Sequence, residues 1–161
     1  MKIKILIPVY NDWQSVFKLL ENINSEVSNL DHEFSVIIVN DASTEAKPEL
    51  SVNLEKLNSI KIINIKENQG HARCNAVGLK HIFENEEFDY VIPMDGDGED
   101  RPEEIKQLVD NLNYHPDKPI VGERIKRSEG IFFKFCYFVH KIITSTFTGQ
   151  SIKYGNYTCL P

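Results

Sequence analysis

The chain has 161 residues and a mass of 18.5 kDa, which is the size of one ordinary domain. Apolar residues make up 41% of it and charged residues 26%, with 8 Gly and 7 Pro, so the collagen-like, low-complexity and disordered classes are excluded. Its three cysteines lie far apart and form no CxxC pair. That spacing argues against a disulfide framework or a cysteine zinc site, and it favours a reducing, cytoplasmic compartment.

The formal charge of −6 is unevenly distributed along the chain. Residues 1–120 carry 12 Lys and Arg against 22 Asp and Glu, whereas residues 121–161 carry 6 against 2 and hold 8 of the 16 aromatic residues. An acidic body argues against nucleic acid as a partner, because binding to phosphate backbones needs clustered positive charge. The opening apolar run is too short for a signal core, and lysines interrupt the apolar stretch at 131–147, so we expect neither a secretion signal nor a membrane span.

The first 113 residues alternate between two hydrophobic periods. Short apolar runs rich in β-branched residues predict buried strands, and apolar residues at helical spacing predict helices. In chain order we expect a strand at 3–9, a helix at 13–27, a strand at 34–39, a weaker helix at 49–57, a strand at 60–65, a helix at 72–83, a strand at 89–94, a helix opening at Pro102, and the start of a strand at 120–121. This alternation predicts an α/β fold with a mostly parallel central sheet flanked by helices.

Polar clusters follow three of the four strands expected in this region, at residues 10–12, 40–44 and 95–100. In sheets of this kind, ligands bind beyond the carboxyl ends of the strands. Because the three clusters fall at the same edge, the pattern predicts a binding site there.

The segment at 91–103 (VIPMDGDGEDRPE) is the most informative of the chain. Asp95, Asp97 and Glu99 alternate directly after a strand, so an extended backbone would project all three carboxylates to one side. Gly96 and Gly98 between them allow bending and the close approach of a ligand. Crowded carboxylates repel one another unless a cation intervenes, and oxygen ligands suit Mg²⁺ or Mn²⁺ with substrate phosphate completing the coordination.

The acidic segment also allows other interpretations. An EF-hand loop is excluded, because Asp100 and Lys106 stand where the loop requires Gly and Glu. A phosphatase with an aspartyl nucleophile also uses an Asp-x-Asp pattern, although Thr or Val usually stands there in place of Glu99. A solvated acidic turn at the start of the helix at Pro102 is the structural alternative.

Asp41 ends the second expected strand within VIIVNDAST. It could form a simple turn with Asn40 and Ser43. It could also accept a hydrogen bond from the ring N–H of a base such as uracil or guanine, since it should lie near the acidic segment on the same sheet edge.

The segment at 68–73 (NQGHAR) is expected to be a loop that opens a helix. Backbone N–H groups at that helix start could face a diphosphate, with Arg73 adding positive charge. We expect His71 to be a surface side chain and Cys74 to be a core residue.

Taken together, these motifs make the sequence resemble the family 2 inverting glycosyltransferases, which have the Rossmann-like GT-A fold. The resemblance covers residues 3–113 in order and with family-like spacing, through PVYND (8–12), VNDAST (39–44), NQGHARCNAVG (68–78) and DGDGEDRPE (95–103). The last motif looks most like the branch that transfers sugars to polyisoprenyl phosphates, such as dolichol-phosphate mannosyltransferase. That branch usually has Gln where this chain has Glu99.

The resemblance implies transfer of a sugar, with inversion, from a nucleotide-diphosphate sugar linked to UDP or GDP. The implied acceptor is a polyisoprenyl phosphate, which is already ionised and needs no strong general base. The residues implied to contact the nucleotide sugar are Pro8, Tyr10, Asp12, Asp41 (for the base), Gly70, Arg73 and Asp95.

The same resemblance implies a catalytic pair, Asp95 and Asp97. It also implies that Asp95, Asp97 and Glu99 hold Mg²⁺ or Mn²⁺, which would neutralise the diphosphate leaving group.

The basic and aromatic C-terminal segment fits the acceptor side of such an enzyme. Residues 121–127 resemble the family's arginine-bearing strand, so Arg124 and Arg127 are expected to bind acceptor phosphate. A helix at 131–148 would carry Lys134 and Lys141 on one face. It would suit peripheral contact with the cytoplasmic face of an anionic membrane, or packing against a further C-terminal part of the protein.

The expected organisation is therefore a nucleotide-sugar-binding core at 1–120 and an acceptor-side segment at 121–161, which is short relative to the family. The sequence departs from the family pattern at three places. Asn40 replaces the usual Asp, Ala42 replaces the usual Gly, and YGNY at 154–157 stands where relatives often have an Asp.

Two other functions stay open. One is a module that binds nucleotide sugar without turnover. The other is nucleotidyl transfer to sugar phosphates, which usually begins with a Gly-rich loop bearing Lys or Arg after the first strand.

Overall fold

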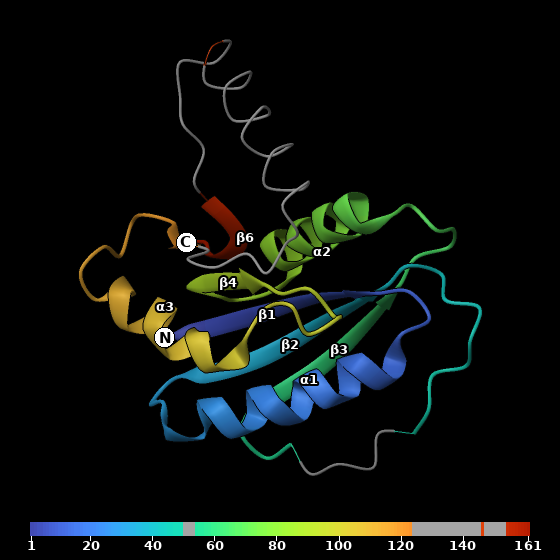
Figure 1. Cartoon of the computed structure of the whole chain (residues 1–161), viewed down its shortest axis with the longest axis horizontal. Helices are drawn as coiled ribbons and strands as arrows, with labels where there is room; N and C mark the ends of the chain where they lie inside the picture. The colour runs from blue at the N-terminus through green and yellow to red at the C-terminus, as the bar shows by residue number, and fades with distance from the viewer. Residues whose placement is uncertain (50–53, 124–145, 147–153) are drawn as a thin grey trace, which may run out of the picture. The chain divides into compact units, whose positions relative to one another are not determined.

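The computed structural model describes residues 1–49, 54–123, 146 and 154–161 (Figure 1). By its internal contacts the chain divides into two units. The first consists of Met1–Ile120 together with Tyr157–Pro161, and the second is Val121–Asn156. The strands and helices considered below belong to the first unit, except where β5 and β6 are named.

Strands and helices alternate as the sequence predicts, except between β2 and β3, where no helix is found among the described residues. In chain order the elements are β1 (Lys2–Val9), α1 (Trp13–Glu26), the 3₁₀ turn η1 (Val27–Asn29), β2 (Glu33–Asn40), β3 (Leu57–Asn64), α2 (His71–Asn85), β4 (Tyr90–Pro93), the 3₁₀ turn η2 (Pro102–Glu104), α3 (Ile105–Leu112), β5 (Ile120–Glu123) and β6 (Tyr154–Cys159).

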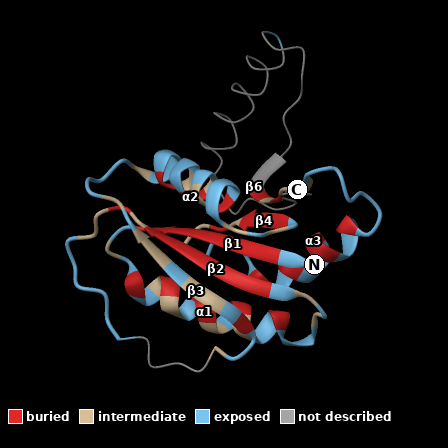
Figure 2. Ribbon diagram, turned by 180° about the vertical axis from the view of Figure 1, so that it is seen from behind, coloured by how far each residue is buried: buried red, intermediate tan, exposed pale blue. Residues whose placement is uncertain are grey.

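The central sheet has the strand order β3-β2-β1-β4, and all three pairings are parallel. β1 is therefore an interior strand, flanked by β2 and β4, and it is buried along almost its whole length (Figure 2). A strand that is covered on both faces must be apolar on both, which explains its continuous apolar run. The α/β fold with a mostly parallel sheet is confirmed.

Each face of the sheet has its own hydrophobic cluster. Ile3, Ile5 and Ile7 of β1 pack with residues of α1 and α3, whereas Leu6 of the same strand packs with residues of α2. Alternate side chains of a strand point to opposite faces, so one strand supplies both clusters. Helices thus cover both faces of the sheet, and they leave its carboxyl edge to the loops.

Gly78 explains how closely α2 approaches the sheet. A Cβ atom at this position would lie 2.3 Å from Leu6 Cδ1 and 2.9 Å from Val39 Cγ2. The absence of a side chain therefore lets the middle of α2 rest directly on β1 and β2.

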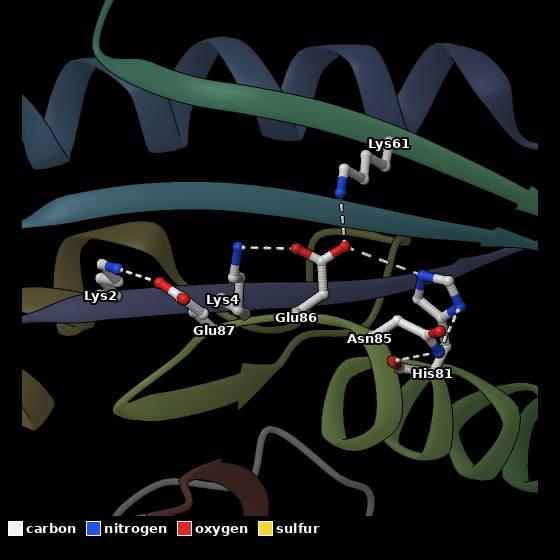
Figure 3. A network of polar contacts seen from close by, with 7 residues as sticks. All are labelled: Lys2, Lys4, Lys61, His81, Asn85, Glu86 and Glu87. Atoms are coloured by element: carbon white, nitrogen blue, oxygen red, sulfur yellow. Dashed lines mark hydrogen bonds and ion pairs between the residues drawn. The ribbon is translucent and has the colours of Figure 1, made fainter.

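A compact ion network lies where α2 ends, on the face of the sheet that this helix covers (Figure 3). Glu86 accepts hydrogen bonds from Lys4 Nζ at 3.1 Å and from Lys61 Nζ at 2.5 Å, and His81 Nε2 lies 3.8 Å from it. The side chain of Glu86 is only 8% exposed and that of Lys4 only 11%. Charges that are removed from water to this degree must be paired, and here one carboxylate pairs with cations from β1 and β3.

The last residues of the chain belong to the first unit. Leu160 pairs with Val91 of β4 in an antiparallel bridge, and the buried Tyr157 hydroxyl lies 3.9 Å from Met94 Sδ. Burial raises the pKa of the Cys159 thiol to about 12, so this cysteine is an inert core group. The structure also contains a two-stranded sheet of β5 and β6.

One expected element is absent at the residues that the structure describes. Glu49 and residues 54–56 of the expected helix at 49–57 are not helical, and Leu57 begins β3. Leu57 pairs with Phe34 of β2 and is buried, so pairing with the sheet overrides a weak helical pattern. The expectation of a helix was wrong for these residues.

Of the described part of the chain, no helix has the length and apolar character needed to cross a membrane. The basic and aromatic stretch at 131–148, apart from Thr146, lies outside the described residues.

Candidate functional site

The loops after β1 and β2 are joined by a hydrogen-bond network centred on Asn11. Its backbone N–H donates to Ser43 Oγ at 2.9 Å, and its side-chain oxygen accepts from the N–H groups of Thr44 at 2.8 Å and Glu45 at 3.1 Å. Asn11 has a φ of +59°, which asparagine tolerates better than most residues. This network brings two of the three predicted polar clusters together at the carboxyl edge of the sheet.

Asp41 stands at the centre of this edge and is only 4% exposed. Its Oδ1 accepts from the Gln69 N–H at 2.8 Å, and its Oδ2 accepts from the Gly70 N–H at 2.9 Å. The carboxylate therefore clamps the backbone just before α2. Gly70, with a φ of +82°, permits the turn into the helix.

The turn that was the alternative for Asp41 is also present. The N–H of Ser43 donates to Asn40 Oδ1 at 3.0 Å, and the intervening Ala42 has a φ of +56°. A left-handed backbone is strained by about 1 kcal/mol for a residue with a Cβ. The usual family Gly at this position would be free of that strain. The contact of Asp41 with a nucleobase stays a prediction.

Asp95 follows β4 and meets the start of α2. Its Oδ1 lies 3.2 Å from His71 Nε2, and its own backbone N–H donates to Asp100 Oδ2 at 2.8 Å. The Asp95 side chain is 31% exposed, so it is held in place and still open to solvent. His71 was expected to be a surface side chain, and at 56% exposure it is one. The sequence analysis did not predict its contact with Asp95. One feature could have indicated it: His71 follows Gly70 at the start of a helix that begins at this edge of the sheet.

Asp97 and Glu99 lie beyond a turn. The N–H of Glu99 donates to Asp97 Oδ1 at 2.9 Å, and Gly98 has a φ of +83°. β4 ends at Pro93, so the extended backbone that would have aligned the three carboxylates is absent. Gly96 is required by close packing, because a Cβ there would lie 3.0 Å from the Pro8 carbonyl oxygen.

The acidic residues do not assemble the implied three-carboxylate set. In the described parts of the chain, no group of three or more His, Cys, Asp or Glu side chains could hold a metal ion. The donor atoms nevertheless have the right chemistry, because Mg²⁺ is commonly held by one or two carboxylates plus substrate phosphates. The acidic-turn alternative stays open, because Asp97 and Glu99 are exposed in the turn and Glu103 and Glu104 stand in the first turn of η2.

The remaining residues implied by the resemblance lie around the same edge. Pro8 is buried in β1, and Tyr10 is exposed just after it. Asp12 caps α1, because its Oδ1 accepts from the Ser15 N–H at 3.2 Å. Arg73 is exposed on α2, and its Nη1 donates to Gln69 Oε1 at 3.0 Å.

A pocket of about 460 Å³ lies beside the acidic turn. Asp97, Gly98 and Arg101 line it from one side, and Gln14 and Lys18 of α1 line it from the other.

Cys74 is a core residue, as expected. Burial, and after it the charge of Asp41, raises the pKa of its thiol to about 11. Arg124 and Arg127, the implied acceptor-phosphate residues, lie outside the described residues.

Solved structures share this fold. A mannosyltransferase from Pyrobaculum calidifontis, solved with GDP-Man and Mn²⁺, matches 98% of this chain and 44% of its own with a TM-score of 0.60 and 20% sequence identity. S. aureus TarS 1–349, solved with UDP-GlcNAc, matches 81% of this chain and 37% of its own with a TM-score of 0.59 and 24% identity. The fold is that of the GT-A glycosyltransferases.

Curated relatives match almost the whole chain at low identity. They include undecaprenyl-phosphate 4-deoxy-4-formamido-L-arabinose transferases from Salmonella choleraesuis (strain SC-B67), 26% identical over 162 residues, and from Photorhabdus laumondii, 28% identical over 160 residues. Both matches cover 99% of this chain and 47% of the relative, so the chain spans about half the length of the curated relatives it matches. The family model described as "Glycosyl transferase family 2" matches residues 4–159. The chain belongs to glycosyl transferase family 2.

Proposed function

We propose that this chain is the donor-binding part of a glycosyltransferase that moves a sugar, with inversion, from a nucleotide-diphosphate sugar to a polyisoprenyl phosphate. The observation that carries the proposal is the meeting of the Asp41 clamp, the start of α2 and the Asp95 loop at one edge of the sheet. In parallel α/β sheets this edge is where ligands bind. The acceptor class is supported by the curated relatives, which are named as undecaprenyl-phosphate sugar transferases.

The donor would lie across this edge from base to sugar. Tyr10 and Asp41 would contact the nucleobase. Gly70 and Arg73, at the first turn of α2, would face the diphosphate with backbone N–H groups and a positive charge. Asp95, which is half-exposed at the end of β4, would contact the sugar.

Asp95 and Asp97, with Glu99 as a third candidate, are the residues that would hold Mg²⁺ or Mn²⁺ at this site. Such an ion offsets the negative charge of the leaving diphosphate. The phosphate oxygen of a polyisoprenyl phosphate is already ionised, so its attack needs no strong base from the chain. Arg124 and Arg127 would bind this phosphate, and residues 131–148 would lie on the membrane that contains it.

Calorimetry tests donor binding first. The full chain should bind a UDP-sugar or a GDP-sugar, and Mn²⁺ should strengthen that binding. Transfer of a radiolabelled sugar to a polyprenyl phosphate then tests turnover. Binding without transfer would favour the binding module, and absence of any binding would contradict both.

Asp97→Asn tests the metal role directly. The variant should lose the Mn²⁺-dependent part of nucleotide-sugar affinity, a loss of about tenfold or more, because a neutral amide is a weaker ligand for a hard cation. Asp117→Asn, in an exposed loop, is the matched control and should bind like the unmodified chain. Undiminished Mn²⁺-linked affinity in Asp97→Asn would refute a ligand role for this residue.

A further inference from the structure

The contact between His71 and Asp95 joins two elements that are far apart in the sequence. His71 is the first residue of α2, and Asp95 lies two residues beyond the end of β4. Their Nε2 and Oδ1 atoms are 3.2 Å apart. Asn75 Nδ2, four residues further along α2, lies 2.9 Å from the same Nε2 atom, so the imidazole is held by its own helix where it faces Asp95.

The backbone of His71 is fixed from both sides. Before it, Asp41 binds the N–H groups of Gln69 and Gly70 with its two oxygens. After it, the Cys74 N–H donates to the Gly70 carbonyl oxygen at 3.0 Å and begins the helical hydrogen bonds of α2. The imidazole therefore reaches Asp95 from a rigid position and not from a free loop.

The two oxygens of the Asp95 side chain differ in their surroundings. Oδ1 faces His71, whereas in the described part of the chain no hydrogen bond to Oδ2 is found. The side chain is 31% exposed, so a ligand at the sheet edge can reach the carboxylate. An anchored carboxylate with one open oxygen is preorganised, because it loses little conformational freedom when a ligand binds.

We propose that His71 is a positioning residue for Asp95: it holds Oδ1 so that Oδ2 points toward the donor sugar or its metal ion. This inference rests on the proposed function of the site. His71 acts through Asp95 and does not itself touch the reacting atoms. Without the imidazole, Asp95 would rotate freely and bind the donor less tightly.

The test uses the full chain and calorimetry with UDP- and GDP-sugars in the presence of Mn²⁺. His71→Ala should weaken binding by about tenfold, as the loss of an outer-shell partner typically does. His71→Gln should restore affinity to within about twofold, because its amide N–H reaches about as far from Cβ as Nε2 does. His81→Ala, a histidine on the same helix, is the matched control and should not change affinity.

A double-variant comparison separates positioning from a general structural effect. If His71 acts through Asp95, His71→Ala should cause no further loss of affinity in a chain that already carries Asp95→Ala. An equal loss in both backgrounds would overturn the inference, and so would unchanged affinity in His71→Ala alone.

A measurement without ligand keeps the two proposals distinguishable. The imidazole ¹⁵N resonances of His71 should shift in Asp95→Ala while those of His81 stay in place. An unchanged His71 resonance would overturn the positioning inference even where the donor binds. Failure of the unmodified chain to bind any donor, together with a shifted His71 resonance, would contradict the proposed function and leave the His71–Asp95 contact supported.

Discussion

The two ends of helix α2 both carry polar networks, and they differ in how completely each network is satisfied. At the C-terminal end, Glu86 is 8% exposed and is surrounded by Lys4, Lys61 and His81 (Figure 3). At the N-terminal end, the Asp95 side chain is 31% exposed, and its one side-chain contact among the described residues is with His71. The acidic side chain at the C-terminal end of the helix is thus enclosed by cations, whereas the one at its N-terminal end is accessible to solvent. We call these the closed and the open end of α2.

This difference separates a structural role from a binding role. A carboxylate that is buried among cations has no capacity left for a ligand, and its loss leaves the cations unpaired. A carboxylate that is anchored by one oxygen can bind a further partner with the other. We therefore expect substitutions at the C-terminal end of α2 to change stability, and substitutions at its N-terminal end to change binding.

The largest expected effect on stability is at Glu86. Glu86→Gln should lower the free energy of unfolding by about 2 kcal/mol, because it leaves the buried Lys4 ammonium without its partner while Lys61 can turn to water. Chemical denaturation measures this change. Nucleotide-sugar affinity should be unchanged, and a large loss of affinity would break the contrast between the two ends of the helix.

Glu87→Gln is the matched control for this substitution. Glu87 is adjacent in sequence, but its side chain is 86% exposed and pairs with Lys2 at the surface. Exposed ion pairs contribute little to stability. The unfolding midpoint of Glu87→Gln should therefore stay close to that of the unmodified chain.

Asp41→Asn should have a smaller effect on stability and a larger one on binding. An amide has only one acceptor oxygen, so it would satisfy one of the two N–H groups of Gln69 and Gly70 and repel the other. We expect a loss of about 1 kcal/mol in unfolding free energy. The loss of donor-binding free energy should exceed the loss of unfolding free energy, because the clamp fixes the position of the start of α2.

Asp31→Asn, in an exposed bend, is the control for the Asp41 substitution and should change neither quantity. If Asp41→Asn lowered stability alone and left donor affinity intact, the open end of α2 would be no different in kind from the closed end.

The smallest expected effect is a dependence of stability on pH. The hydrogen bond from Lys61 lowers the pKa of Glu86 below its ordinary value of 4.5, burial acts in the opposite direction, and Lys4 adds to the lowering. A carboxyl group whose folded-state pKa is depressed stabilises the fold above its unfolded pKa, and this stabilisation is lost as the pH falls through the folded value. Thermal melts between pH 7 and pH 3 should show a steeper decline for the unmodified chain than for Glu86→Gln. Parallel declines would exclude this contribution from Glu86.

Much of the fold could be predicted from the sequence, because strand and helix periods are local properties. The apolar run of β1, the stripe of α1 and the Pro that opens η2 each predicted an element that the structure contains. The expected helix at 49–57 failed at its described residues because Leu57 gains more from pairing with β2 than from a weak helical pattern.

The location of the site was also predictable, whereas its contacts were not. The topology of a parallel sheet places the residues after β1, β2 and β4 at one edge, so Asp41 and Asp95 were expected there. The alignment of Asp95, Asp97 and Glu99 depended on an extended backbone, and the turn at Gly98 removes that alignment. The pairing of His71 with Asp95 joins two separate segments, and periodicity carries no information about such a pair.

By itself, the sequence determined the α/β alternation, the edge at which polar residues gather and the membership of the family, because these follow from local patterns and from motifs in a set order. Only the tertiary structure decided that Asp41 clamps the start of α2, that His71 contacts Asp95 and that Glu86 is enclosed by lysines. Those contacts depend on how closely each helix packs against the sheet, and Gly78 sets that distance for α2. A distance of this kind is a property of the packed core, and it cannot be predicted from any single segment of the chain.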